Sequence, residues 1–227
     1  VPVSVNYTFY EDVDDEITGA GNINGLPIIL TKSFIYRLEG KIGITGSGNT
    51  RLRVLSERIG CVGGNSVVSG DKFLYFAGEM GFYRTDGYKI ELLSSSLQDS
   101  YKKLVDTQSK RDKISASYDP RENRVFWAVN ENNSADNDTV WVYHANTRGF
   151  SKTDSVIFYP KVLTNYDGAL YYGDTDGYVF KSDKTIKNDT VRDMDTVSTS
   201  WHSTHIDFEW KSGAIDFGTP GARKWVK

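Results

Sequence analysis

The sequence predicts an all-β protein built from propeller-like blades of antiparallel strands, with a short helical insertion and a C-terminal β segment. Aromatic residues make up 13% of the 227 residues, mostly as 14 Tyr and 11 Phe, and these residue types favour strands. Aromatic hairpins recur about every 45 to 50 residues. That period matches one four-stranded propeller blade. No long stretch has the 3.6-residue spacing of a helix bundle.

The repeated unit is a pair of short aromatic or β-branched runs around a polar turn. FLYFAGEMGFYRTDG (73–87) and ALYYGDTDGYVFKSD (169–183) have nearly the same pattern of residues. The expected strand pairs are Pro27–Leu30 with Phe34–Leu38, Phe73–Ala77 with Gly81–Arg84, Val125–Val129 with Thr139–His144, and Leu170–Tyr172 with Tyr178–Lys181. Tyr and Phe side chains can stack across each pair.

Segments between the hairpins are expected to supply the remaining strands of each blade. The candidates are RLRVLSER (51–58), GNSVVSG (64–70), KISASYDP (113–120) and SVIFYPKVLTNYD (155–167). A β-sandwich of irregular meanders shares the hairpin signal and differs in its period, so it remains an alternative. Four units would make a small or partial ring.

One stretch interrupts the strand pattern, and the pattern fails near the end. Ser94–Lys113 offers a serine cap followed by apolar residues at helical spacing, which predicts a short amphipathic helix on a sheet surface or edge. After about Lys184 the chain is polar and loop-like before alternation resumes. We therefore expect a propeller-like domain over 1–184. Residues 185–227 would be a linker and C-terminal β segment that closes the ring or starts a second β-domain.

Composition excludes several classes of protein. The net charge of −3 and pI near 5.7 argue against a protein that grips nucleic acid over a basic surface. Cys61 is the single cysteine, so no disulfide framework or thiol metal cluster is expected, and it reads as a core or strand-edge thiol. No apolar run is long enough to span a membrane as a helix.

Possible metal sites have simpler explanations. Asp174–Gly177 reads as a turn between aromatic strands, because the twelfth residue of a calcium loop starting there would be Thr185. The acidic run Asp12–Glu16 is expected to be solvated or to dock on a partner. His202 and His205 would face opposite sides of a strand, so they would not share one ion. We expect no metal site and no cofactor.

Catalytic signatures are also missing from the sequence. His144 has no evident Ser or carboxylate partner, and Ser66 and Ser69 lack the spacing of a nucleophile elbow. No pair of carboxylates stands out for glycoside hydrolysis, because the two residues of such a pair must be close in space but need not be close in sequence. The Gly-rich stretches Gly43–Arg51 and Gly60–Ser66 read as loops without a phosphate-binding motif. We expect no catalytic, cofactor-binding or metal-binding residues, and no enzyme.

Three phrases carry a resemblance to a known family. They are INGLPIILTKSFIYRLEGKIG (23–43), ERIGCVGGNSVVSGDKFLYFAGEMGFYRTDGYKIELLS (57–94) and WHSTHIDFEWKSGAIDFGTPGARKWVK (201–227). Together they resemble the tail nozzle proteins of short-tailed bacteriophages, called tail tubular protein B or, in a related group, packaged-DNA stabilisation protein. The last phrase resembles the family's passage from a propeller to the next β-domain.

The resemblance implies a structural protein of the virion. Such subunits form a ring, typically sixfold, in the phage tail, and the genome is retained behind the ring and ejected through it. The implied partners are copies of the chain, a portal-side adaptor, a tail fibre or needle, and genomic DNA that passes without specific binding. No membrane is implied. The loops Asn130–Asp138 and Thr185–Thr196 are the expected contact surfaces.

Two other functions remain open on the sequence. A carbohydrate-binding or carbohydrate-active propeller would use Trp, Tyr and Asp residues, which are abundant here. A receptor-binding adhesion module would look much the same.

Overall fold

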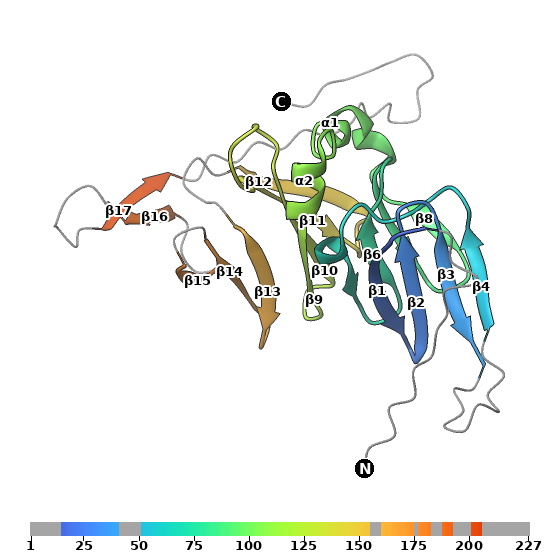
Figure 1. Ribbon diagram of the computed structural model, residues 1–227. Coiled ribbons are helices and arrows are strands. Elements are labelled where there is room, and N and C mark those ends of the chain that lie inside the picture. The colour runs from blue at the N-terminus through green and yellow to red at the C-terminus, as the bar shows by residue number, and fades with distance from the viewer. Residues whose placement is uncertain are drawn as a thin grey trace, which may run out of the picture. The chain divides into compact units, whose positions relative to one another are not determined.

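The computed structural model describes residues 15–40, 51–154, 160–174, 177–182, 188–192 and 201–205. The chain divides into two compact units, Val1–Asp183 and Lys184–Lys227, and the sheets described next belong to the first unit (Figure 1). The expected boundary lay after residue 184.

Unit 1 holds four antiparallel sheets, each made of strands that follow one another in the chain. The first sheet contains β1 (Ile17–Ile23), β2 (Leu26–Thr31), β3 (Ile35–Glu39) and β4 (Arg51–Ser56). The second contains β5 (Val68–Ser69), β6 (Leu74–Ala77), β7 (Phe82–Thr85) and β8 (Ile90–Leu92). The third contains β9 (Ser115–Asp119), β10 (Arg124–Val129), β11 (Thr139–His144) and β12 (Gly149–Asp154). The fourth contains β13 (Val162–Tyr166), β14 (Ala169–Gly173) and β15 (Val179–Lys181).

These sheets confirm the all-β prediction. Each of the four expected hairpins is a paired set of strands: β2 with β3, β6 with β7, β10 with β11, and β14 with β15. The segments between the hairpins supply β4, β5, β9 and β13, as the sequence predicts.

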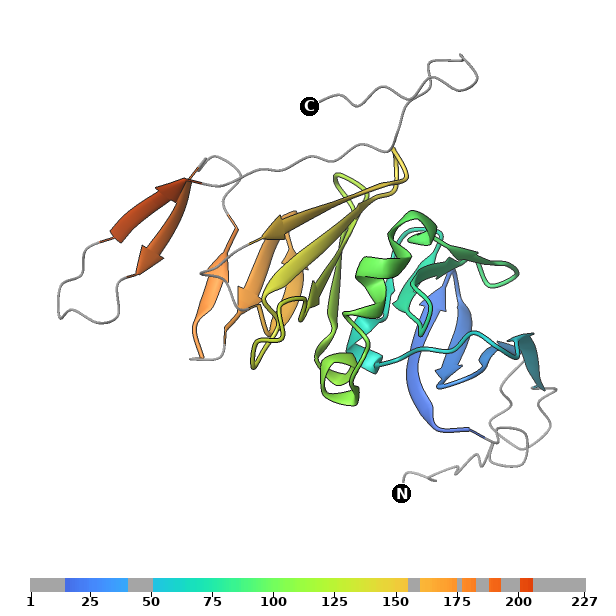
Figure 2. The ribbon, with the colours of Figure 1, turned by 90° about the horizontal axis from the view of Figure 1, so that it is seen from above.

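The sheets pack face to face in chain order, and three apolar clusters fill the spaces between them. The first and second sheets enclose a cluster that includes Ile28, Leu30, Leu74 and Phe76. The second and third enclose the largest cluster, in which the rings of Phe82 and Trp127 stack with centroids 4.2 Å apart. The third and fourth sheets share a smaller cluster, to which the fourth sheet contributes Leu163. Figure 2 shows the succession from blue through green and yellow to orange.

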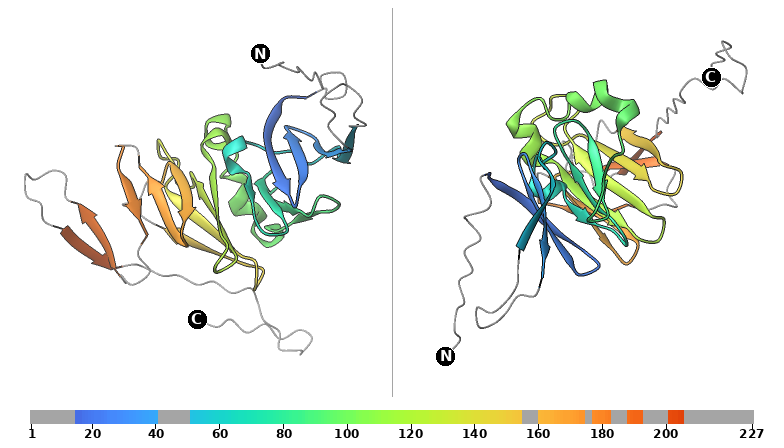
Figure 3. Two further views of the ribbon diagram at one scale, coloured as in Figure 1. Left: turned by 90° about the horizontal axis from the view of Figure 1, so that it is seen from below. Right: turned by 90° about the vertical axis from the view of Figure 1, so that its right-hand side faces the viewer.

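The first strands of successive sheets lie next to one another. β1 contacts β5, β5 contacts β9, and β9 contacts β13. Blades of a propeller are arranged in this way, with the first strand of each blade closest to a common axis. Figure 3 shows the sheets following one another in the order of the colours. The sheets are therefore propeller-like blades.

The helical insertion differs from the single helix that the sequence predicts. A 3-10 turn (Ser95–Leu97) leads into α1 (Gln98–Lys102), and α2 (Gln108–Lys113) follows after a break. Ser94 does not cap the helix, because its Oγ accepts a hydrogen bond from the backbone N–H of Phe82 at 3.0 Å. The apolar positions are nevertheless buried as expected: Tyr101 and Leu104 join the cluster between the second and third sheets.

The glycines of RIGCVGGNS (58–66) are sites of close packing. A Cβ on Gly60 would lie 1.9 Å from the carbonyl oxygen of Lys32, and one on Gly64 would lie 2.5 Å from that of Thr18. A Cβ on Gly63 would lie 2.7 Å from the carbonyl oxygen of Arg111, at the end of the helical insertion. This segment therefore threads between the first sheet and the helices, and only glycine fits there.

Unit 2 contains an antiparallel pair, β16 (Asn188–Arg192) and β17 (Trp201–His205). The turn expected at Gly218–Gly221 lies outside the described residues. Within the part of the chain that the structure describes, no helix is both long enough and apolar enough to cross a membrane.

Candidate functional site

A groove of about 560 Å³, lined by both polar and apolar residues, runs along the first strands of the second, third and fourth sheets. β5 contributes Ser69, β9 contributes Ser117 and Tyr118, and β13 contributes Thr164 and Asn165. Adjacent residues of a strand face opposite sides, so Ser117 and Tyr118 line different parts of the groove, and so do Thr164 and Asn165. Its walls offer several hydrogen-bond donors and acceptors.

An ion pair crosses one end of this groove. Arg121 Nη2 lies 2.6 Å from Asp167 Oδ1, joining the turn after β9 to the turn between β13 and β14. Both side chains are exposed, so the pair adds little to stability. Each of them can still present charge to a ligand.

One side of the groove holds an aromatic ring. Tyr118 stacks on Tyr75 with ring centroids 6.2 Å apart, and its hydroxyl donates to Asn123 Oδ1 at 3.1 Å. Burial, and then the nearby Asp71 carboxylate, raise the pKa of Tyr118, so its phenol stays protonated at neutral pH. On the facing strand, Asn165 Nδ2 is buried without a hydrogen-bond partner.

The first strands carry almost no charge. In β1, β5, β9 and β13 the single side chain of the Asp, Glu, Lys, Arg or His type is Asp119, which is 1% exposed. Its Oδ2 accepts from Arg124 Nη2 at 3.1 Å, and its Oδ1 accepts from the backbone N–H of Arg121. Asp119 therefore closes the turn after β9.

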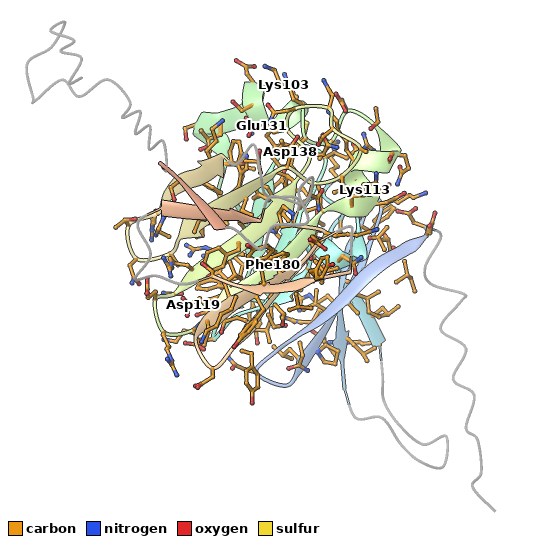
Figure 4. All side chains as sticks on the ribbon, turned by 90° about the vertical axis from the view of Figure 1, so that its left-hand side faces the viewer. Lys103, Lys113, Asp119, Glu131, Asp138 and Phe180 are labelled. Atoms are coloured by element: carbon orange, nitrogen blue, oxygen red, sulfur yellow. The ribbon has the colours of Figure 1, made fainter. Side chains whose placement is uncertain are left out.

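The expected contact loop Asn130–Asp138 is organised around its last residue. Asp138 is 4% exposed, and its carboxylate accepts from the backbone N–H groups of Glu131 (2.9 Å) and Asn132 (3.0 Å). The hydroxyls of Ser134 (2.8 Å) and Thr139 (3.0 Å) donate to it as well. Although burial opposes ionisation, these hydrogen bonds lower the pKa of Asp138 below its usual value. Figure 4 shows Asp138 beside Glu131 and Lys113, away from Asp119.

His144 has a partner that the sequence did not reveal. Its Nε2 lies 2.9 Å from Ser151 Oγ, across the β11–β12 pair. The two residues are seven apart, and the diagonal contact depends on the turn between the strands. Burial, and next the charge of Arg124, lower the pKa of His144. No described carboxylate hydrogen-bonds this pair, so it lacks the third member of a hydrolase triad.

The other residues considered from the sequence have structural roles where they are described. Asp174 Oδ1 accepts from the backbone N–H of Tyr178 at 2.9 Å, and Gly177 has φ +84°, which is turn geometry. Asp15 Oδ2 accepts from Thr31 Oγ1 and from the backbone N–H of Ser33, so it ties down the β2–β3 turn.

Cys61 is a buried core thiol, as the sequence predicts. Its Sγ lies 3.4 Å from the hydroxyl of Ser66, and burial raises the pKa of the thiol. Ser66 donates to the carbonyl of Gly63 and accepts from the backbone N–H of Ala77, so it is not poised as a nucleophile.

His202 and His205 lie on β17, while most of Thr185–Thr196 and of Asp12–Glu16 lies outside the described residues. Across the described ranges, no three His, Cys, Asp or Glu side chains gather where they could hold a metal ion.

No protein-family model matches the chain, and no curated protein matches it. Among solved structures, a crystal structure of a nidogen/laminin complex is similar over 79% of this chain, with 15% identity and a TM-score of 0.44. The chain spans 59% of that structure's length. A crystal structure of a computationally designed protein, Ika4, is similar over 76% of this chain and 93% of its own, with 12% identity and a TM-score of 0.43. Likenesses this weak carry no argument about function.

Proposed function

We propose that the chain is a structural subunit of a short-tailed phage tail nozzle, where it forms a ring with its own copies and acts through its shape. The observation that carries this proposal is the exposed outer face of the fourth sheet. Val162, Tyr166 and Val179 are 57%, 73% and 75% exposed there. The residues equivalent to Val179 in the other three sheets are buried, namely Ile35, Phe82 and Val140. Clustered exposed apolar side chains mark a surface that binds another protein.

The phrases that resemble the nozzle family coincide with the framework of the fold. Residues 23–43 contain β2 and β3, and residues 57–94 contain the close-packed glycines and the whole second sheet. The resemblance therefore covers strands of the first two sheets and is not confined to turns. This supports the proposal at the level of the framework.

The charge distribution supports passage of DNA without retention. Several exposed basic side chains are already paired with carboxylates, among them Lys32 with Glu16, Arg51 with Glu39, and Lys152 with Glu131. A paired cation contributes less to phosphate binding than a free one, and the chain as a whole carries a net charge of −3.

A salt titration of DNA binding tests the proposal that DNA passes through the ring without being retained. We expect weak binding of duplex DNA, equal for unrelated sequences, with an affinity that falls as salt rises because only phosphates are contacted. Fluorescence anisotropy with two unrelated labelled duplexes measures this. Tight binding that depends on sequence would contradict the proposal. In the same proposal the chain has no turnover on glycans or esters, and one substrate whose hydrolysis disappears on replacing a single carboxylate would overturn that part.

The groove favours a second candidate, a carbohydrate-binding protein. An aromatic ring beside hydroxyl, amide and charged groups suits a sugar, which presents C–H faces and many hydroxyls. A glycan array with the wild-type chain and a Tyr118→Ala variant tests it. A glycan bound by the wild type and lost in the variant would favour this candidate.

A further inference from the structure

Each of the first three sheets presents one face to the next sheet in the chain, and the same four positions form the centre of that face. We call these positions the forward square: two alternate residues of the second strand and the two residues opposite them on the third. The squares are Ile28, Leu30, Ile35 and Arg37 in the first sheet, Tyr75, Ala77, Phe82 and Arg84 in the second, and Phe126, Ala128, Val140 and Val142 in the third. In the fourth sheet the same register gives Tyr171, Gly173, Val179 and Lys181.

The opposite face of each sheet carries a matching feature, a directly opposed pair that we call the backward pair. The pairs are Ile29 with Tyr36, Phe76 with Tyr83, Trp127 with Trp141, and Tyr172 with Phe180. In the second and fourth sheets the two rings stack, with centroids 5.5 and 5.2 Å apart.

Within the chain, the backward pair of one sheet packs on the forward square of the sheet before it. Phe76 and Tyr83 share a cluster with Ile28, Leu30 and Ile35. Likewise, Trp127 and Trp141 lie in the cluster that contains Phe82. Every residue of the first three squares is buried as a result.

The square of the fourth sheet is open. Val179 is 75% exposed and Lys181 is exposed as well, whereas their equivalents in the second sheet, Phe82 and Arg84, are buried. Val162 and Tyr166 extend the same exposed apolar face along β13. The repeat therefore leaves one square that no described sheet of the first unit covers.

The position of Lys181 in the open square also holds a basic residue in the first two sheets, and there that residue is buried. Arg37 occupies this position in the first sheet, and its Nη1 donates to the carbonyl oxygen of Gly87 in the second sheet at 2.8 Å. Arg84 occupies it in the second sheet and pairs with Glu91 at 2.6 Å. Lys181 is thus no obstacle to covering the square, because it can reach an acceptor on the sheet that covers it.

The backward face of the first sheet is the surface that would match the open square. No described residues form a sheet before it, and its backward pair, Ile29 and Tyr36, is continued across β1 and β4 by Ala20 and Val54. Ala20 is exposed and Val54 is 44% exposed. Tyr36 stacks on Phe34 and is buried already, so new contacts would come from Ala20, Ile29 and Val54.

We infer that the open square of the fourth sheet binds the backward face of the first sheet of a second copy. This contact would be a fourth sheet-on-sheet interface of the kind that occurs three times within the chain. It joins two different surfaces, so repeating it head to tail gives a ring or a filament and not a two-fold dimer. The inference names the interface that would join the copies in the proposed ring. It rests on the proposed function only for the number of copies, because the two surfaces follow from the repeat within the chain.

Sedimentation of the whole chain with three variants tests this interface. Val179→Asp places a charge in the open square, and Val54→Asp places one on the backward face of the first sheet. Met80→Asp is the matched control, because Met80 is 57% exposed at the β6–β7 turn, away from both surfaces. An unpaired buried charge is costly, so we expect each of the first two to weaken self-association by about tenfold or more. The control should associate as the wild type does.

Mixing the two interface variants gives the sharper result. Each retains one intact surface, so the mixture should form a dimer that neither variant forms alone. Circular dichroism checks that all variants keep the β-sheet signal. A wild type that stays monomeric up to about 1 mM, a Val54→Asp variant that associates normally, or a mixture that stays monomeric would each overturn the inference. None of these outcomes depends on DNA, so the salt titration can still succeed if this interface fails.

Discussion

The guanidinium of Arg37 in the first sheet donates from Nη1 to the carbonyl oxygen of Gly87 in the second sheet, over 2.8 Å. The same guanidinium lies 4.3 Å from the ring centroid of Tyr88 and pairs with Glu39 on its own sheet. Arg37 is 5% exposed. One buried side chain therefore links two sheets that are adjacent in the fold and far apart in sequence.

Replacement of Arg37 by methionine should lower the free energy of unfolding by about 2–3 kcal/mol, because the carbonyl of Gly87 loses a charged donor. Urea unfolding measures the change. Arg51→Met is the control, since Arg51 also pairs with Glu39 but its side chain is 76% exposed, and it should have little effect. Equal losses of unfolding free energy in the two variants would show that the hydrogen bond from Arg37 to Gly87 in the second sheet contributes little to stability.

Gly60→Ala should be strongly destabilising, by about 3 kcal/mol, because its Cβ would meet the backbone of Lys32 at 1.9 Å. Thermal unfolding of the variant beside Gly149→Ala checks this. Gly149 has its nearest neighbour atom at 3.6 Å, on Thr147, so an added methyl group there fits. If Gly60→Ala is as stable as Gly149→Ala, the close packing described for this segment is wrong.

Asp138→Asn should loosen the loop Asn130–Asp138 and cost about 2 kcal/mol. The amide retains one acceptor oxygen but turns an N–H₂ group toward donors that bonded the carboxylate. Hydrogen exchange should then be faster at the backbone amides of Glu131 and Asn132. Asp136→Asn serves as the control, because Asp136 is paired only with Lys113 in the described contacts, at 3.7 Å. Unchanged exchange in the Asp138 variant would contradict this role.

Protonation of His144 should destabilise the fold. Its pKa in the folded chain lies below the ordinary 6.5, so the unfolded chain binds more protons in this range. Stability should therefore fall as pH drops through 6.5 toward the lower folded value. His144→Gln should remove this component, which unfolding curves between pH 7 and 5 would reveal by difference. A pH dependence identical in the variant and the wild type would refute the assignment.

The hairpins were predictable because local chemistry specifies them. The pair Phe76 and Tyr83 arises from two aromatic runs around a turn that contains two glycines, and both signals lie within a short stretch of sequence. The break between α1 and α2 was not predictable, because the apolar spacing of Tyr101 and Leu104 fits one helix equally well. Packing between two sheets decides the actual path.

The contacts of the groove required the tertiary structure. Ser117 and Asn165 come together because β9 and β13 are neighbours, and nothing local in either strand shows this. Ser151 was within reach of a sequence argument, because an antiparallel β11–β12 hairpin brings it near His144. The three closely packed glycines Gly60, Gly63 and Gly64 are predicted as loop residues, because a close approach of backbone leaves no local signal.

The most direct test of the central claim is electron microscopy of the self-associated chain. The account predicts closed rings of identical copies joined head to tail, with a central lumen wide enough for duplex DNA. It also predicts that the fourth sheet of each copy lies on the first sheet of the next. Two-fold dimers with like faces joined, or particles without a lumen, would contradict it.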